Sequence, residues 1–161
     1  MVAAALGALP EEIVFTSGGT ESDTLAVRGA ALAVREREPE RSRVVFSAAE
    51  HSAVREAARS LAADGFEPVE LPVDDAGLPG EELLASALDA RTAVVSLILA
   101  NNETGVVNVR LADAARVARL AGAVVHTDAV QAVGKIPVRP GALGVDLLSF
   151  TGHKFGGPKG A

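Results

Sequence analysis

The sequence of 161 residues contains no cysteine. This absence excludes a disulfide-stapled fold, a thiolate zinc site, a cysteine-ligated iron–sulfur cluster and a thiol nucleophile within these residues. Stability must therefore come from an apolar core. The composition permits one, because 48% of the residues are hydrophobic and 22% are charged.

Basic residues and aromatic rings are also scarce. Lys and Arg total 15 against 21 Asp and Glu, and aromatic residues make up 3% of the chain, all of them Phe. Proteins that bind nucleic acid usually present a basic surface to the phosphates and aromatic platforms to the bases. We therefore expect no direct DNA binding.

Long apolar runs are missing too. No segment approaches the roughly 18 consecutive apolar residues that a membrane span requires. The alanine-rich start, residues 1–10, lacks the basic region of a signal peptide. These observations predict no membrane association and a cytoplasmic location.

The chain instead alternates short apolar runs with segments of helical periodicity. The expected strands are Glu12–Thr16, Arg43–Ser47, Phe66–Leu71, Ala93–Ala100, Ala123–Thr127 and Val145–Phe150. The expected helices are Thr20–Glu38, Ser52–Ala63, Pro79–Leu88 and Leu111–Ala121, and the opening residues resemble the tail of another helix. Apolar strands separated by helices predict an α/β fold with a mostly parallel sheet and helices on both faces. No linker or repeat divides residues 1–161.

Polar residues follow almost every expected strand. Ligands of such sheets gather beyond the carboxyl ends of the strands. The clusters there are 17–20 (SGGT), 50–51 (EH), 101–103 (NNE), Asp128 with Gln131, and 151–154 (TGHK). This convergence is the main functional signal in the sequence.

The glycines before the first long helix suit a phosphate. Backbone N–H groups at a helix start are unpaired, and the helix dipole favours an anion there. The alternative is a simple cap, since residues 20–23 (TESD) resemble a capping box with Asp in the Glu position. Because neither a GxGxxG sequence nor a complete Walker loop is present, the phosphate is not expected to belong to NAD or ATP.

Two other clusters contain groups that can carry or exchange a proton. His51 begins a helix, where the dipole favours the neutral ring, which could stack on a heterocycle or accept a proton; it could equally be a surface residue. Asp128 ends an apolar strand and needs a partner, which could be a cationic ligand nitrogen, a basic side chain or the backbone of the next turn. A metal held by His126 and Asp128 with His51 and His153 is a weaker alternative because the spacing is loose.

Lys154 lies in a glycine-rich loop directly after an apolar strand. In an apolar pocket or near cations its amine would become a nucleophile able to form a Schiff base, whereas the simpler role is a point charge for a phosphate. Asn102 could hydrogen-bond a ligand or its own turn.

The clusters together suit one cofactor with a phosphate, a pyridine nitrogen and an aldehyde. The chain also resembles a known family in five segments that occur in the same order: IVFTSGGTESDTLA, AEHSAV, NNETGVV, HTDAVQAVGK and SFTGHKFGGPKG. These segments resemble the cysteine desulfurases, which belong to the class V aminotransferase group of fold-type I pyridoxal-phosphate enzymes. The resemblance covers nearly the whole chain. It implies that residues 1–161 form part of the large, cofactor-binding domain of such a transferase.

The resemblance assigns a role to each site residue and makes pyridoxal 5'-phosphate the expected cofactor. Lys154 matches the lysine that bonds to the cofactor, Asp128 matches the acid that pairs with the pyridine nitrogen, and His51 matches the histidine that stacks on the ring and moves protons. The remaining matches are phosphate contacts (Gly19, Thr20, Thr151 and His153) and residues that hydrogen-bond the ring oxygen (Asn102 and Gln131). Thr151 replaces the family's usual Ser but keeps the hydroxyl. The resemblance makes none of the expected site residues a metal ligand.

The family's sulfur-transfer cysteine lies in a later domain, and a further segment precedes the region matched here. We therefore expect residues 1–161 to be an incomplete large domain, without the N-terminal segment and the C-terminal small domain, and inactive alone.

The expected function is the core of an enzyme that converts L-cysteine to L-alanine and keeps the sulfur as a persulfide. That sulfur would serve iron–sulfur cluster assembly or tRNA thiolation, through a sulfur-acceptor or scaffold protein, in a homodimer. Two alternatives stay open at this point: another class V enzyme, such as a selenocysteine lyase or an aminotransferase, and a non-catalytic fragment that binds the cofactor.

Overall fold

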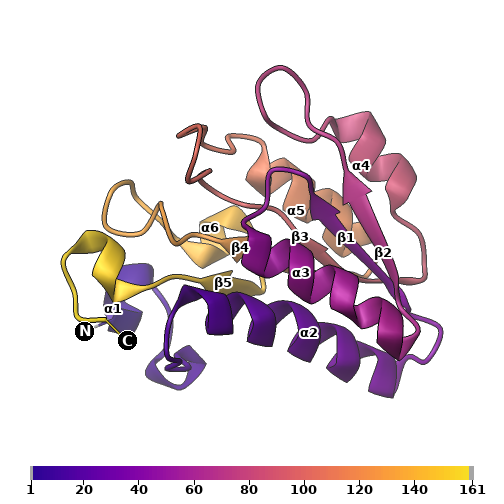
Figure 1. The fold of residues 1–161 in the computed structure, drawn as a ribbon, viewed down its shortest axis with the longest axis horizontal. Helices are drawn as coiled ribbons and strands as arrows, with labels where there is room; N and C mark the ends of the chain where they lie inside the picture. Colours follow the sequence, from indigo (N-terminus) through magenta and orange to yellow (C-terminus); the bar gives the residue numbers. More distant parts are fainter. Residues whose placement is uncertain (1, 160–161) are drawn as a thin grey trace.

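A computed structural model describes residues 2–159, which form one parallel sheet with helices around it (Figure 1). The sheet has five strands in the order β2-β1-β3-β4-β5. Their bounds are β1 Arg43–Ser47, β2 Glu67–Leu71, β3 Thr92–Ser96, β4 Val124–Asp128 and β5 Leu147–Ser149. All four neighbouring pairs are parallel. The predicted α/β class and parallel sheet are confirmed.

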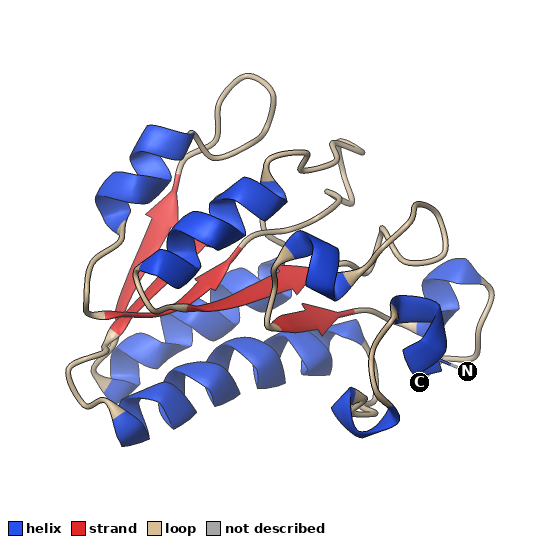
Figure 2. Cartoon of the chain, turned by 180° about the vertical axis from the view of Figure 1, so that it is seen from behind, coloured by secondary structure: helices blue, strands red, loops and turns tan. Residues whose placement is uncertain are grey.

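Helices cover both faces of the sheet, as the sequence predicts. The helices are α1 Val2–Leu6, α2 Gly19–Arg37, α3 Ser52–Ser60, α4 Glu81–Ala87, α5 Leu111–Leu120 and α6 Pro140–Leu143. Figures 1 and 2 show α2 and α3 along one face, with α4 and α5 on the other. Short 3-10 turns occur at Pro10–Glu12 (η1), Leu61–Asp64 (η2) and Gly152–Phe155 (η3).

The alternation of side chains along β1 explains the two layers. Val44 and Phe46 belong to an apolar cluster that includes Val27 of α2 and Val54 of α3. Val45 points to the opposite face, into the cluster that contains residues of α4 and α5. Successive side chains of a strand point to opposite faces, so a strand that is apolar throughout is buried on both.

One expected strand is not formed. Residues 13–16 have no regular structure, and none of the described strands pairs with them. Val14 and Phe15 are 71% and 75% exposed. A β-branched and aromatic run favours a strand only where a neighbouring strand supplies the hydrogen bonds, and the described part of the sheet places none beside this run.

The other expected elements agree with the structure within a few residues, and most differences lie at strand ends, whereas the short helix α6 was not expected. The expected strand Ala93–Ala100 stops at Ser96. Beyond it, the Leu97 and Leu99 amides still donate to the carbonyls of His126 and Asp128, at 3.1 and 2.9 Å. Gly65 ends the α3–η2 helical segment in the left-handed conformation, as expected of a glycine stop. None of the helices within residues 2–159 has the length and hydropathy needed to cross a membrane.

Candidate active site

The strand order of the sheet reverses at β1. The chain passes from β1 to β2 on one side, whereas β3 lies on the other side of β1. In open α/β sheets, ligands bind beyond the carboxyl ends of the strands at such a reversal of strand order. The loops after β1 and β3 are joined there, because the Asn101 side-chain amide donates to the Ala49 carbonyl at 2.8 Å.

Asn101, not Asn102, holds the turn after β3. Its Oδ1 accepts from the amides of Glu103 and Thr104 at 2.9 and 2.8 Å. Asn102 is exposed on the same turn. Asn101 therefore makes the hydrogen bonds to the turn that were one of the two roles considered for Asn102. The other role, a ligand contact by Asn102, stays a prediction.

Asp128 ends β4 and is buried, with 4% of its surface exposed. Its Oδ1 accepts a hydrogen bond from the Val130 amide at 2.8 Å, so one oxygen takes the backbone role considered above. Burial raises the pKa of the Asp128 carboxyl, and the Val130 bond and the nearby His51 oppose that rise. A cationic partner at this position would stabilise the ionised carboxylate.

His51 is the N-cap of α3, as its position at the predicted helix start implies. Its Nδ1 accepts a hydrogen bond from the Ala53 amide at 3.2 Å. An acceptor nitrogen carries no proton, so the neutral ring holds its proton on Nε2. The ring is half-buried and lies near enough to Asp128 to affect its charge.

The start of α2 has the features of an anion site. Gly18 is the N-cap, with φ 156° and ψ −178°, a backbone conformation almost confined to glycine. Within the described residues no side chain caps this helix start. A Cβ at Gly19 would come within 3.1 Å of Val130 Cγ2 and 3.8 Å of Thr151 Cγ2, so the helix start adjoins the segments after β4 and β5.

The alternative capping box at residues 20–23 is wrong. Thr20 lies inside α2 and not at its cap, and Asp23 is buried with 1% of its surface exposed. The helix begins earlier than that alternative requires, because Gly18 can adopt the extended conformation that starts it. The backbone N–H groups of the first turn remain available for an anion.

The loop after β5 combines a buried hydroxyl with an exposed lysine. Thr151 is 1% exposed, and its Oγ1 lies 3.0 Å from His153 Nδ1. His153 and Lys154 are exposed on η3. Among the described residues, Lys154 is thus exposed to solvent and does not lie in the apolar pocket considered from the sequence.

Gln131 is half-buried in the turn after β4, and its side-chain oxygen accepts a hydrogen bond from the Lys135 ammonium. The structure brings Gly19, the segment after Asp128 and Thr151 together, and places His51 near Asp128. The ligand contacts expected of Thr20, Asn102, Gln131, His153 and Lys154 stay predictions.

A cluster of buried polar side chains lies beside Asp128. It contains Asp23 of α2, Glu50 after β1 and His126 of β4, all of them at most 4% exposed. Of its members, Asp23 was not predicted as part of the site, whereas Glu50 belongs to the predicted cluster after β1 and His126 to the metal alternative. Burial and the charge of Asp128 raise the pKa of Asp23 to about 8, and the same two causes raise that of Glu50 well above its usual range. For Asp23 the only sequence signal was a charged residue at an otherwise apolar position of a helix.

The structure does not favour the metal interpretation of the histidines. The two ring nitrogens of His126 lie 2.8 Å from Ser96 Oγ and 2.9 Å from Ser149 Oγ, so neither is directed at an open site. Within residues 2–159, no group of three or more His, Cys, Asp or Glu is arranged to hold a metal ion.

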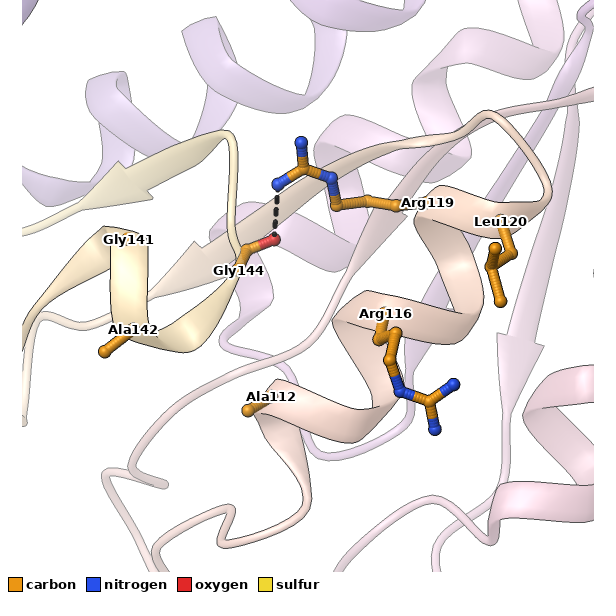
Figure 3. A pocket seen from close by; sticks show the side chains of 7 residues that line it. All are labelled: Ala112, Arg116, Arg119, Leu120, Gly141, Ala142 and Gly144. Atoms are coloured by element: carbon orange, nitrogen blue, oxygen red, sulfur yellow. Dashed lines mark hydrogen bonds between the residues drawn. The ribbon is translucent and has the colours of Figure 1, made fainter.

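A hollow between α5 and α6 lies away from these residues (Figure 3). It measures about 360 Å³ and is lined by Ala112, Arg116, Arg119, Leu120, Gly141, Ala142 and Gly144. Arg119 reaches across to the Gly144 carbonyl at 3.4 Å, whereas Arg116 extends away from α6. None of the predicted site residues lines it, so it is not the candidate active site.

Comparison with known proteins supports the fold described above. Cysteine desulfurase IscS of Dictyoglomus turgidum is 43% identical over 159 residues, which are 99% of this chain and 39% of that protein. The crystal structure of DndA from Streptomyces lividans superposes with a TM-score of 0.86 at 38% identity, covering 99% of this chain and 43% of that one. SspA in complex with cysteine superposes with a TM-score of 0.90 at 34% identity, covering 99% and 45%.

The chain thus spans about two fifths of the length of the relatives it matches. The match to the family described as Aminotransferase class-V extends over residues 1–161. On this evidence, together with the parallel sheet and its polar strand ends, the chain belongs to the class-V aminotransferase family.

Proposed function

We propose that the protein carrying this chain is a cysteine desulfurase that uses pyridoxal 5'-phosphate to convert L-cysteine to L-alanine. The observation that carries the proposal is the buried Asp128 at the end of β4, at the same edge of the sheet as the uncapped start of α2. The relatives support the choice of reaction, because those named above include a cysteine desulfurase and a protein solved with cysteine.

The residues present fit the cofactor at two points. The carboxyl of Asp128 has a pKa raised by burial, which a cationic ring nitrogen would bring down. The first turn of α2 offers backbone N–H groups and the positive end of a 19-residue helix to a phosphate. Gly18 adds space, since a Cβ there would meet no described atom within 4 Å.

Each residue then has a chemical task. Asp128 holds a proton on the ring nitrogen, and the bound cofactor supplies an electron-withdrawing ring that favours loss of substituents from the substrate. Gly19, Thr20 and Thr151 bind the phosphate, with His153 beside Thr151. Lys154 provides the amine for the covalent link, and its exposure leaves it accessible.

His51 is placed to handle a proton near the same carboxylate. Because its Nδ1 is occupied by the Ala53 amide, the proton that it can hold or release is on Nε2. Asn102 and Gln131 would hydrogen-bond the oxygen substituent of the ring. The homodimer, the sulfur-acceptor protein and the cytoplasmic location remain parts of this proposal that rest on the sequence.

Borohydride reduction followed by peptide mass mapping tests the covalent link. Reduction of the purified protein should fix a phosphopyridoxyl group on Lys154, and Lys154→Ala should abolish the label. Lys159→Ala is the matched control, since Lys159 is an exposed lysine of the same loop, and it should keep the label at Lys154. A label on Lys159 or Lys135, or no label in the unaltered protein, would refute the assignment.

A further inference from the structure

A row of buried polar side chains crosses three strands beneath the candidate active site. Ser96 of β3, His126 of β4 and Ser149 of β5 are at most 3% exposed. His126 Nδ1 lies 2.8 Å from Ser96 Oγ, and its Nε2 lies 2.9 Å from Ser149 Oγ. Asp128 and Ser149 are register partners, so this row runs directly into the site.

Asp23 of α2 closes the row from the helix side. Its Oδ1 lies 3.8 Å from His126 Nε2, and among the described residues no atom makes a hydrogen bond to this buried oxygen. The nearby Ser149 hydroxyl lowers the pKa of the Asp23 carboxyl and so opposes the effect of burial. Asp128 is the register partner of Ser149 on the neighbouring strand, and its charge raises the pKa of Asp23.

Neither neighbour of Asp23 supplies a compensating positive charge. His126 is neutral, because complete burial lowers its pKa to about 3. Within residues 2–159, no Lys or Arg forms an ion pair with Asp23. The other ionisable groups near the pair are Glu50, which has Arg55 beside it, and His51 near Asp128. Two neighbouring buried carboxyls that no described Lys or Arg pairs with cannot both ionise freely.

The surroundings decide which of the two keeps the proton. Asp128 receives the Val130 amide at 2.8 Å and lies near His51, and both interactions stabilise its negative charge. Asp23 has the Ser149 hydroxyl alone to oppose its burial and the charge of Asp128. The carboxyl with fewer stabilising contacts holds the proton more tightly.

We propose that Asp23 is a positioning residue that retains a proton, so that the Asp23–Asp128 pair carries one negative charge and that charge stays on Asp128. Asp23 thereby keeps Asp128 ionised for a cationic group at the strand end without adding a second buried charge. This inference deepens the proposed function, because the cationic group there is the ring nitrogen of the cofactor.

Carbon-13 NMR of protein labelled at the aspartate side-chain carboxyl tests the proposal directly. The purified protein is titrated between pH 4 and pH 9, with and without added pyridoxal phosphate. Without the cofactor, one aspartate signal should titrate far above the usual range, near the value given above for Asp23. Asp23→Asn should abolish that step, and Asp128→Asn should move it to lower pH because the repelling charge is gone.

Two controls distinguish the titration of Asp23 from that of other groups, and the result does not depend on the proposed function. Because only aspartate is labelled, Glu50 gives no signal. Asp75→Asn, at an exposed position, is the control variant and should leave the high-pH titration step unchanged. The titration of the unaltered protein does not depend on any variant folding, and no aspartate titrating above pH 6 would overturn the proposal. So would a high step that survives Asp23→Asn but vanishes in Asp128→Asn, or one that Asp128→Asn leaves unmoved. The titration measures the protein's own carboxyl groups. A negative result would therefore not affect the labelling of Lys154, which tests the proposed function separately.

Discussion

His126 shows how a single side chain can make stability depend on pH. It is fully buried between two serine hydroxyls, and burial lowers its pKa to about 3 from its usual range. The unfolded chain binds a proton at this ring below about pH 6.5, whereas the folded chain does not. The contribution of the neutral ring to stability is therefore complete above that pH and is lost as the pH falls towards 3.

A substitution of this residue gives a measurable prediction. His126→Asn removes the titrating ring and leaves a serine hydroxyl unpaired, which should cost about 1–3 kcal/mol at pH 7. Below pH 6 the gap in unfolding free energy between the two proteins should narrow by about 1.4 kcal/mol per pH unit. Urea denaturation at pH 7, 5.5 and 4.5 measures this gap, and a gap that stays constant would contradict the buried neutral ring.

At the scale of elements, α5 illustrates how burial sets the value of an apolar side chain. Leu111 and Leu120 begin and end this helix, with 0% and 79% of their surfaces exposed. The same residue type on one helix thus occupies the core cluster at one end and the surface at the other.

Leucine truncations on α5 should separate these two environments. Leu111→Ala should lower the unfolding free energy by about 2–5 kcal/mol, because it leaves a cavity in the core. Leu120→Ala, the matched control, should change it by less than about 0.5 kcal/mol. Chemical denaturation measures both, and similar losses for the two variants would show that α5 does not pack against the sheet as described.

At the scale of the whole molecule, the proposed reaction needs more than these residues contain. Cysteine desulfurases are expected to transfer sulfur to a cysteine of the enzyme, and the 161 residues have none. The matched relatives are more than twice as long.

The 161-residue chain alone should therefore release no sulfide from L-cysteine in the presence of a thiol reductant. A methylene-blue sulfide assay measures the release, with cysteine desulfurase IscS of Dictyoglomus turgidum as the positive control. Sustained turnover by the isolated chain would show that sulfur transfer does not require the expected cysteine.

The class of fold and the order of the site residues along the chain can be predicted from the sequence. Apolar runs such as Arg43–Ser47 read as buried strands and Leu111–Ala121 reads as a helix because these patterns are local and repeat with the period of the element. Polar residues at strand ends were recognisable for the same reason: a parallel sheet brings all its carboxyl ends to one edge. Gly18 and His51 could be placed at helix starts from their immediate neighbours.

Which residues come into contact depends on how distant segments of the chain pack together. Residues 13–16 have the composition of a strand, but strand formation depends on a partner elsewhere in the chain, and no described strand lies beside them. The contact of Asp23 with His126 and Ser149 joins a helix to two strands far along the chain, so no local pattern predicts it. Burial and mutual charge then raise the pKa of Asp23, and both arise from distant segments packing together.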